Sequence, residues 1–259
     1  MSKPCEREPP GNRSIFFSTP ITIPYHPDHI HYNTLFPDAE FLASAGDAPC
    51  FRSLDPMAEW VGVKGTQYEK RWKFALTETF GFREQKQVTE VSEGMSLNLG
   101  QVTIQFLHLP GHTPGHMGFL IPEYKICFLA DMELSEAGPW YPNKRSDIDQ
   151  TIQSIEKIRK IPANYYIPSH GGVVRREDID SRLDRYLQNI LLREEKIFSA
   201  LATPRTLDEI TSLSLISGFR LLPNLLWYYF EKTMVEKHLA RLLSQGRISL
   251  EEEKYCRIN

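Results

Sequence analysis

The sequence lacks a strong excess of charge of either sign. Its 30 Lys and Arg nearly balance its 33 Asp and Glu, which gives a formal net charge of −3 at pH 7 over 259 residues. Proteins that bind nucleic acid are usually basic overall, so the composition gives no sign of such a function, although a local basic patch stays open. The apolar content of 41% is sufficient for a substantial core.

Cysteine is scarce, and long apolar runs are absent. The four cysteines lie far apart, with no Cys-x-x-Cys pair, at positions 5, 50, 127 and 256. This spacing argues against a thiolate zinc site or a disulfide framework and fits free thiols in a reducing compartment. No stretch approaches the roughly 20 apolar residues of a membrane span, and residues 1–13 contain no secretion-signal core. We therefore expect a cytoplasmic protein with no membrane partner and a disordered lead-in over residues 1–13.

Strand-like and helix-like segments alternate from about residue 14 to residue 202, which predicts an α/β fold. Runs rich in β-branched and aromatic residues predict strands over 40–44, 87–91, 102–109, 117–121, 125–130 and 164–168, and a short or edge strand over 15–23. Helical spacing predicts a helix within 56–82, where Trp72, Leu76 and Phe80 are expected in the core. It also predicts helices over 146–160, capped by Ser146, and over 176–201.

The pattern changes after Ala202, where we place a domain boundary. Thr206 and Glu209 form a capping-box signature at the start of a short helix, and a longer helix is expected over about 224–245. Two short β-prone pieces then flank an acidic turn at 251–253. Helix, helix and β-wing in this order indicate a winged-helix-like C-terminal domain over residues 203–259, after a main domain over 14–202.

Histidines and aspartates gather in turns that follow the β-prone runs. The candidates are His26, Asp28, His29, His112, Asp131 and His170. Turns at the ends of neighbouring strands meet on one rim of a sheet, so these side chains are expected to converge there. Imidazole and carboxylate together suit a zinc-type divalent cation, with iron or manganese as alternatives. His108 is expected to lie along a core strand, and His238 to be a partly exposed packing residue within a helix.

The motifs that carry these residues resemble those of the metallo-β-lactamase superfamily. The segments PYHPDH (24–29), PGHTPGH (110–116), FLAD (128–131) and PSHG (168–171) look like its four successive metal motifs. The sequence pattern is similar to that of glyoxalase II-like thioesterases and of β-lactamase-like proteins with a C-terminal winged helix, some of which cleave RNA. The resemblance implies an αβ/βα sandwich with one or two zinc ions on its rim. It assigns His26 and His112 to a first metal, Asp28, His29 and His170 to a second, and Asp131 to a bridge between them.

Two departures from the family pattern fall at the start of the chain. Pro24 stands where the family's first motif has a histidine, so the first metal position is short of one ligand. Few residues precede this motif, so we expect a reduced N-terminal sheet or a shortened chain start. A single tightly bound metal, with a weak or empty first position, is the expected state.

The chemistry implied by the resemblance is hydrolysis by a metal-bound hydroxide. The absence of a Gly-x-Ser-x-Gly nucleophile elbow is consistent with this. Asp28 would orient the hydroxide and Asp131 would bridge the metals, which makes these two the catalytic candidates. His116 is expected to lie behind the ligands and to orient one of them through its other nitrogen.

The loop after Asp131 is the candidate substrate wall. Trp140 and Tyr141 are expected beside the site, with packing beneath the rim as the alternative for Trp140. Lys144, with its neighbour Arg145, is placed to meet an anionic group of a substrate, or is solvated.

Three functions stay open. A metal-dependent hydrolase of a small thioester or ester leads. A metal-dependent endoribonuclease is second, although the acidic wing Glu251-Glu252-Glu253 would repel phosphates. The third is a degenerate, non-catalytic member, because Pro24 replaces a ligand. A persulfide-type iron dioxygenase ranks below these, since it relies on the missing histidine. We expect a small-molecule substrate and leave a nucleic-acid partner and a homodimer open.

Overall fold

The structure is a computed structural model that describes residues 25–36, 39–85, 87–219 and 224–258. The lead-in expected over 1–13, the strand expected over 15–23 and the position of Pro24 lie outside the described residues.

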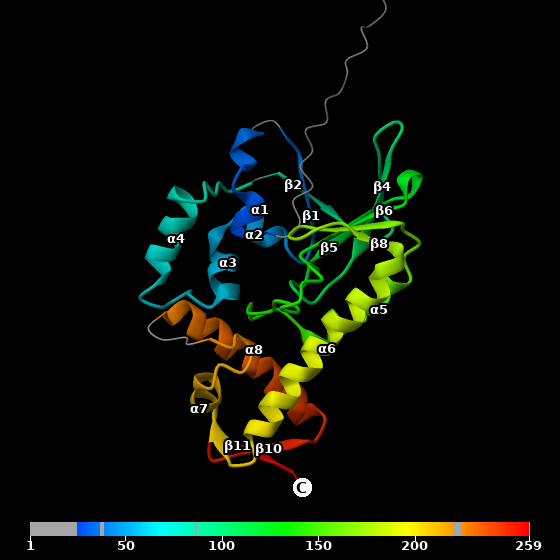
Figure 1. The fold of residues 1–259 in the computed structure, drawn as a ribbon. Helices are drawn as coiled ribbons and strands as arrows, with labels where there is room; N and C mark the ends of the chain where they lie inside the picture. Colours follow the sequence, from blue (N-terminus) through cyan, green and yellow to red (C-terminus); the bar gives the residue numbers. More distant parts are fainter. Residues whose placement is uncertain (1–24, 37–38, 86, 220–223, 259) are drawn as a thin grey trace, which may run out of the picture.

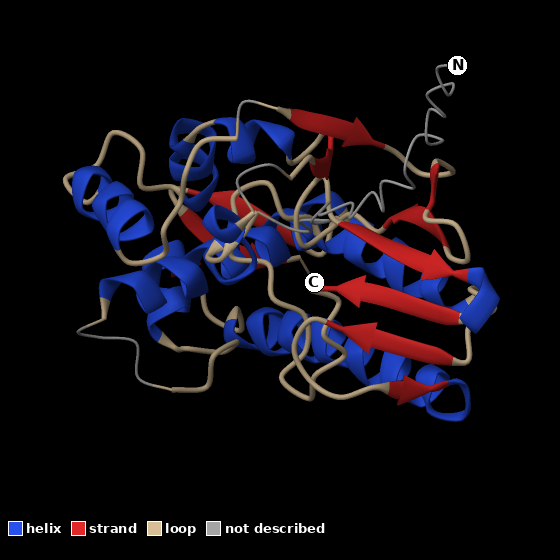
Figure 2. Cartoon of the chain, turned by 90° about the horizontal axis from the view of Figure 1, so that it is seen from above, coloured by secondary structure: helices blue, strands red, loops and turns tan. Residues whose placement is uncertain are grey.

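A six-stranded mixed sheet forms the centre of the molecule, in the order β3-β4-β5-β6-β7-β8. Its strands are β3 (Ser96–Asn98), β4 (Thr103–His108), β5 (Met117–Ile121), β6 (Ile126–Ala130), β7 (Tyr165–Pro168) and β8 (Val174–Arg175). Neighbours pair antiparallel except β6 and β7, which are parallel and connected through a helix. The strands predicted over 102–109, 117–121, 125–130 and 164–168 are confirmed. Figure 2 shows the strands side by side, with helices behind them.

Two helices cover one face of this sheet, α5 (Ile148–Arg159) and α6 (Arg176–Ala200). The apolar stripe of α5, with Ile155 and Ile158 fully buried, packs against Leu129 and Tyr166 from the sheet. The cap expected at Ser146 is wrong by one residue. Asp147 caps α5, because its carboxylate accepts the backbone N–H of Gln150 at 2.8 Å.

The opposite face packs on a second sheet of two parallel strands, β1 (Phe41–Ser44) and β2 (Val88–Val91). Leu42 and Val91 of this sheet meet Ile104, Phe106 and Met117 of the larger one in a shared apolar cluster. Outside β1 and β2 lie α1 (Pro27–Ile30), η1 (Asn33–Leu35), α2 (Ala48–Arg52), α3 (Leu54–Val61) and α4 (Glu69–Glu78). The layers are therefore helix, sheet, sheet and helix, as the expected αβ/βα sandwich requires.

The helix expected within 56–82 is two helices. Gly62 adopts a left-handed φ of +88°, and its N–H bonds to the carbonyls of Ala58 and Glu59. This geometry ends α3, and α4 begins only at Glu69.

The C-terminal segment contains α7 (Leu207–Ser212), α8 (Leu225–Ser244) and a three-stranded sheet of β9 (Arg205–Thr206), β10 (Ile248–Glu251) and β11 (Lys254–Arg257). The capping box of Thr206 and Glu209 is confirmed. In Figure 1 α6 runs from the central sheet into this segment, where Ile197 packs on Val235 and Leu239 of α8. The boundary near Ala202 stays a prediction. Among the described helices, none combines the length and apolarity needed to cross a membrane.

Candidate metal centre

The loops that carry the candidate ligands are held in unusual backbone conformations. Gly111, between β4 and His112, has a φ of +133°, and a side chain there would meet Thr151 of α5 at 2.3 Å. Only glycine fits this approach. At the end of β6 the register with β7 shifts, and Ala130 has a φ of +48°. These two features place His112 and Asp131 together on one rim of the sheet.

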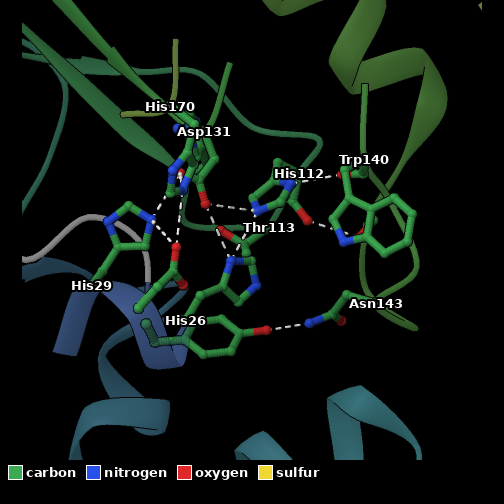
Figure 3. A network of polar contacts seen from close by, with 12 residues as sticks. His26, His29, His112, Thr113, Asp131, Trp140, Asn143 and His170 are labelled. Carbon is green, nitrogen blue, oxygen red and sulfur yellow. Dashed lines mark hydrogen bonds and ion pairs between the residues drawn. The ribbon is translucent and has the colours of Figure 1, made fainter. Parts of the chain in front are cut away.

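All six predicted ligands converge at this rim, and Figure 3 shows five of them, His26, His29, His112, Asp131 and His170. Nδ1 of His26 and Nε2 of His112 each lie 3.2 Å from one oxygen of Asp131, Oδ2. The other oxygen, Oδ1, lies 2.9 Å from Nε2 of His29 and 4.0 Å from Nε2 of His170. Asp131 therefore faces two groups of donors, one through each oxygen.

Asp28 completes the second group of donors. Its Oδ2 lies 2.9 Å from Nε2 of His170 and 3.5 Å from Nε2 of His29. Ligand atoms of His26, His112 and Asp131 form one compact set, and those of Asp28, His29 and His170 form another. Three protein ligands and an open position are typical of catalytic zinc sites, so each set fits one ion.

Two buried atoms at the centre are without hydrogen bonds among the described residues. Nε2 of His29 and Oδ1 of Asp131 lie 2.9 Å apart, yet neither makes a hydrogen bond of acceptable geometry. Buried polar atoms are rarely left unpaired, because each costs about 1–3 kcal/mol. Two such atoms aimed at the same space fit a shared cation.

His116 holds the backbone of Asp131. Its Nε2 accepts the Asp131 N–H at 3.0 Å, so its Nδ1 carries the proton and donates to the carbonyl of Leu109 at 2.9 Å. Burial lowers the pKa of His116 to about 3, so the imidazole stays neutral. The sequence predicted that His116 orients a ligand through its other nitrogen. In the structure, that nitrogen contacts the main chain of Asp131, which is a candidate ligand.

Asp47 and Glu133 belong to the site but were not predicted. The buried carboxylate of Asp47 accepts the Thr113 hydroxyl at 2.6 Å and the Gly115 N–H at 3.0 Å, which fixes the turn after His112. Glu133 lies near Asp131 and His170 as a further oxygen donor. Its position two residues after Asp131 was a usable signal, whereas nothing in the sequence links Asp47 to a turn 66 residues away.

The charges at the centre favour an ionised Asp131. Burial raises the pKa of this carboxyl, but the imidazoles of His112, His26 and His29, which face its two oxygens, outweigh burial and hold the pKa far below its ordinary value. Burial raises the pKa of Glu133, and the negative charge of Asp131 adds to this. A cluster with this much negative charge is suited to a cation.

A cavity of about 550 Å³ opens beside the ligands, between α3, α4, α8 and the loop after β6. Trp140 lines it and also packs edge-to-face on Trp227 and Phe230 of α8. The carbonyl of Trp140 accepts Nδ1–H of His112 at 2.6 Å, which leaves the other nitrogen of His112 free to bind a metal. Trp72, Leu76 and Phe80 also line the cavity. Leu76 is buried in a core cluster and Trp72 packs against it, as expected, whereas Phe80 is exposed, so the expectation that Phe80 lies in the core is wrong.

The predicted position of Tyr141 beside the site is wrong, and of the two alternatives for Lys144 the structure agrees with the solvated one. Tyr141 is fully buried away from the cavity, because its hydroxyl bonds to His238 at 2.8 Å and to Arg193 at 3.0 Å. Lys144 is exposed and does not line the cavity. His238, expected to be partly exposed, is completely buried beside Tyr141.

Comparisons with known proteins agree with this geometry. Residues 25–170 match the family model described as "Metallo-beta-lactamase superfamily". A structure of a metallo-beta-lactamase family protein from Thermus thermophilus superposes with a TM-score of 0.68 at 18% identity, over 91% of this chain and 78% of the other. That likeness concerns the fold.

Curated relatives are similar over shorter segments. They include a Beta-lactamase-like protein 2 homolog of Caenorhabditis elegans, 26% identical over 48% of this chain and 39% of its own length. A hydroxyacylglutathione hydrolase of Haemophilus influenzae is 36% identical over 31% and 39%. An atrochrysone carboxyl ACP thioesterase of Aspergillus fumigatus is 25% identical over 45% and 26%. The chain thus spans well under half the length of these relatives.

Proposed function

Because the chain belongs to the metallo-beta-lactamase superfamily, we propose that it is a metal-dependent hydrolase that acts on a small ester or thioester. The observation that carries this proposal is the convergence of two three-residue donor sets on the two oxygens of Asp131. The names of two relatives, a hydroxyacylglutathione hydrolase and an acyl-carrier thioesterase, favour a thioester over other bonds.

The residues present fit divalent cations. His26, His112 and Asp131 would hold one ion, and Asp28, His29 and His170 a second, with Asp131 between them. The mixed imidazole and carboxylate donors suit zinc, and also iron or manganese. Bound in such a site, a divalent cation supplies Lewis acidity and makes water nucleophilic near neutral pH.

The two aspartates have different environments and therefore different roles. Asp131 is 5% exposed and surrounded by imidazoles, so it holds the donors together. Asp28 is 51% exposed and lines the cavity. Its carboxylate is the one that can orient an incoming water and receive its proton. Glu133, at the same end of the cavity, is a second carboxylate within reach of water.

The alternative functions have less support. A ribonuclease needs cations along the path of its substrate. No Lys or Arg lines the cavity within the described part of the chain, and Glu251, Glu252 and Glu253 form the exposed wing. A non-catalytic role is favoured only by Pro24, and three donors of the first set are present without that position.

The test is hydrolysis of p-nitrophenyl acetate and of an acetyl thioester by protein stripped of metal and then loaded with zinc, manganese or iron(II). We expect hydrolytic activity that depends on added metal and that falls more than about 100-fold in Asp131→Asn. Loss of a residue that merely hydrogen-bonds to a metal ligand typically lowers activity about 10- to 100-fold, and loss of a ligand should lower it further. Asp178→Asn, an exposed change on α6, is the matched control.

Full activity of Asp131→Asn, or activity in excess chelator, would contradict the proposal. Salt-sensitive cleavage of RNA without ester hydrolysis would favour the nuclease. A folded protein that takes up metal but hydrolyses neither substrate would favour the non-catalytic role.

A further inference from the structure

We propose that the cavity beside the ligands binds an uncharged, apolar group next to the scissile bond, so that the substrates are esters or thioesters of medium-length alkyl or aryl compounds. This inference rests on the proposed hydrolase function. The argument comes from the side chains that surround the cavity.

The walls of the cavity are apolar, and they come from segments far apart in the sequence. Met57 and Val61 come from α3, Trp72 comes from α4, and Phe80 lies just after α4. Trp140, from the loop after β6, and Phe230, from α8, add to the apolar lining. The volume of about 550 Å³ lies within the range of about 300–1,000 Å³ found for small-molecule sites. Polar groups are concentrated at the end where the candidate ligands lie.

These walls are partly open to solvent. Phe80 is 37% exposed and Leu226, also on the wall, is 48% exposed. Apolar surface that gathers in one concave place commonly marks a binding site. An apolar substrate would remove this surface from water, at about 25 cal/mol for each Å² that it covers.

Away from the candidate metal ligands, the cavity offers no cationic side chain to an anionic part of a substrate. The charged side chains that line it are the carboxylates of Asp28, Asp131 and Glu133, besides histidines. The two basic residues that follow the aromatic loop do not line the cavity: the guanidinium of Arg145 lies over the ring of Trp60 at 4.5 Å, and Lys144 is on the surface. Within the described residues, no Lys or Arg lines the cavity to pair with a substrate carboxylate or phosphate at a distance from the metal ligands.

The experiment compares two series of substrates. The first consists of p-nitrophenyl esters of acetic, butyric, hexanoic and octanoic acid. The second consists of thioesters in which the alkyl chain of the thiol varies over the same lengths. We expect kcat/KM to rise along at least one series by up to about fourfold for each buried methylene. A six-carbon ester that ends in a carboxylate should be hydrolysed at least 10-fold more slowly than the hexanoyl ester.

Two phenylalanines near α4 give a matched pair of variants. Phe80 lines the cavity, whereas Phe74 is 66% exposed and does not. Phe80→Ala should reduce kcat/KM about 5- to 20-fold for the octanoyl ester and by a smaller factor for the acetyl ester. Phe74→Ala should change neither. Ala75→Phe, which fills the cavity from α4, should abolish the dependence on chain length.

Binding by metal-free protein provides a readout that does not need catalysis. Calorimetry with 1-butanol and 1-octanol should show tighter binding of octanol, weakened by Phe80→Ala and by Ala75→Phe but not by Phe74→Ala. No rise in kcat/KM along either series, equal effects of the two alanine variants, or equal affinity for the two alcohols would overturn the inference while the hydrolase proposal stands. If no ester is hydrolysed but octanol binds with this pattern, the hydrolase proposal fails and the apolar pocket remains.

Discussion

The buried carboxyl of Asp47 makes a quantitative prediction about pH and stability. Asp47 is 2% exposed, and its oxygens accept hydrogen bonds from Thr113 and Gly115. Burial is the largest influence and raises the pKa of this carboxyl from 3.8 to about 6, although the two hydrogen bonds lower it. The perturbation is Asp47→Asn, since an amide has nearly the same shape but does not titrate. An asparagine can accept the N–H of Gly115 and donate to the hydroxyl of Thr113.

The size and the sign of the change in stability follow from the pKa of the Asp47 carboxyl in the unfolded chain, 3.8, and in the native protein, about 6. Between about pH 4 and 6 the native protein keeps a proton on Asp47 that the unfolded chain releases, so the stability contributed by this group is full below pH 4 and lost as pH rises through 6. The raised pKa corresponds to about 3 kcal/mol. The free energy of unfolding of Asp47→Asn, minus that of the wild type, should therefore increase by about 3 kcal/mol from pH 4 to pH 8.

The assay is urea unfolding of chelator-treated protein at half-unit steps of pH. Other titrating groups near Asp47, which include Tyr25, Cys50, His108 and His112, are shared by both proteins and largely cancel in the difference. Asp178→Asn on the surface should stay within about 0.5 kcal/mol of the wild type throughout. A difference that is flat with pH, or that falls as pH rises, would refute the argument from burial.

Three further predictions concern the loops around the centre. Arg193→Met should lower the free energy of unfolding by about 2–4 kcal/mol in urea titrations, because the buried guanidinium donates to the carbonyls of Ala137 and Pro139 and to the hydroxyl of Tyr141. Tyr141→Phe should cost about 1–3 kcal/mol but leave kcat/KM for esters within twofold, since Tyr141 does not line the cavity; a large loss of kcat/KM would contradict its placement. Gly111→Ala should cost more than about 1 kcal/mol and weaken zinc uptake, because the added carbon would lie 2.5 Å from the backbone nitrogen of Thr151; unchanged uptake measured by calorimetry would count against that constraint.

The convergence of the candidate ligands could be predicted because the sequence marks most of them locally. Asp131 directly follows a strand that a β-prone run makes visible, and His112 and His170 lie a few residues after one, each beside a glycine that indicates a tight turn. The strand ends of one sheet meet on one rim, so convergence could be inferred before any contact was known. The same reasoning predicts most of the central sheet.

The cavity and its supports could not be predicted, because they depend on long-range packing. The pairing of Tyr141 with His238 joins residues 97 positions apart, and the cavity joins α4 to α8 across most of the chain. Phe80 continues the helical spacing of core residues, and only the tertiary arrangement decides that it lines a cavity and stays partly exposed instead. Lys144 follows an aromatic loop in sequence, but the turn carries its side chain to the surface.

The six candidate ligands are expected to bind divalent metal. Titration of metal-free protein with zinc by calorimetry, followed by metal analysis of the titrated protein, tests this most directly. We expect one tightly bound zinc per chain at Asp28, His29, His170 and Asp131, lost in His29→Ala and Asp131→Asn and kept in His112→Ala. A second zinc, if bound, should be weaker and should be lost in His112→Ala, since Pro24 offers the first position no imidazole. Folded wild-type protein that takes up no zinc, or Asp131→Asn protein that binds zinc as the wild type does, would contradict the account.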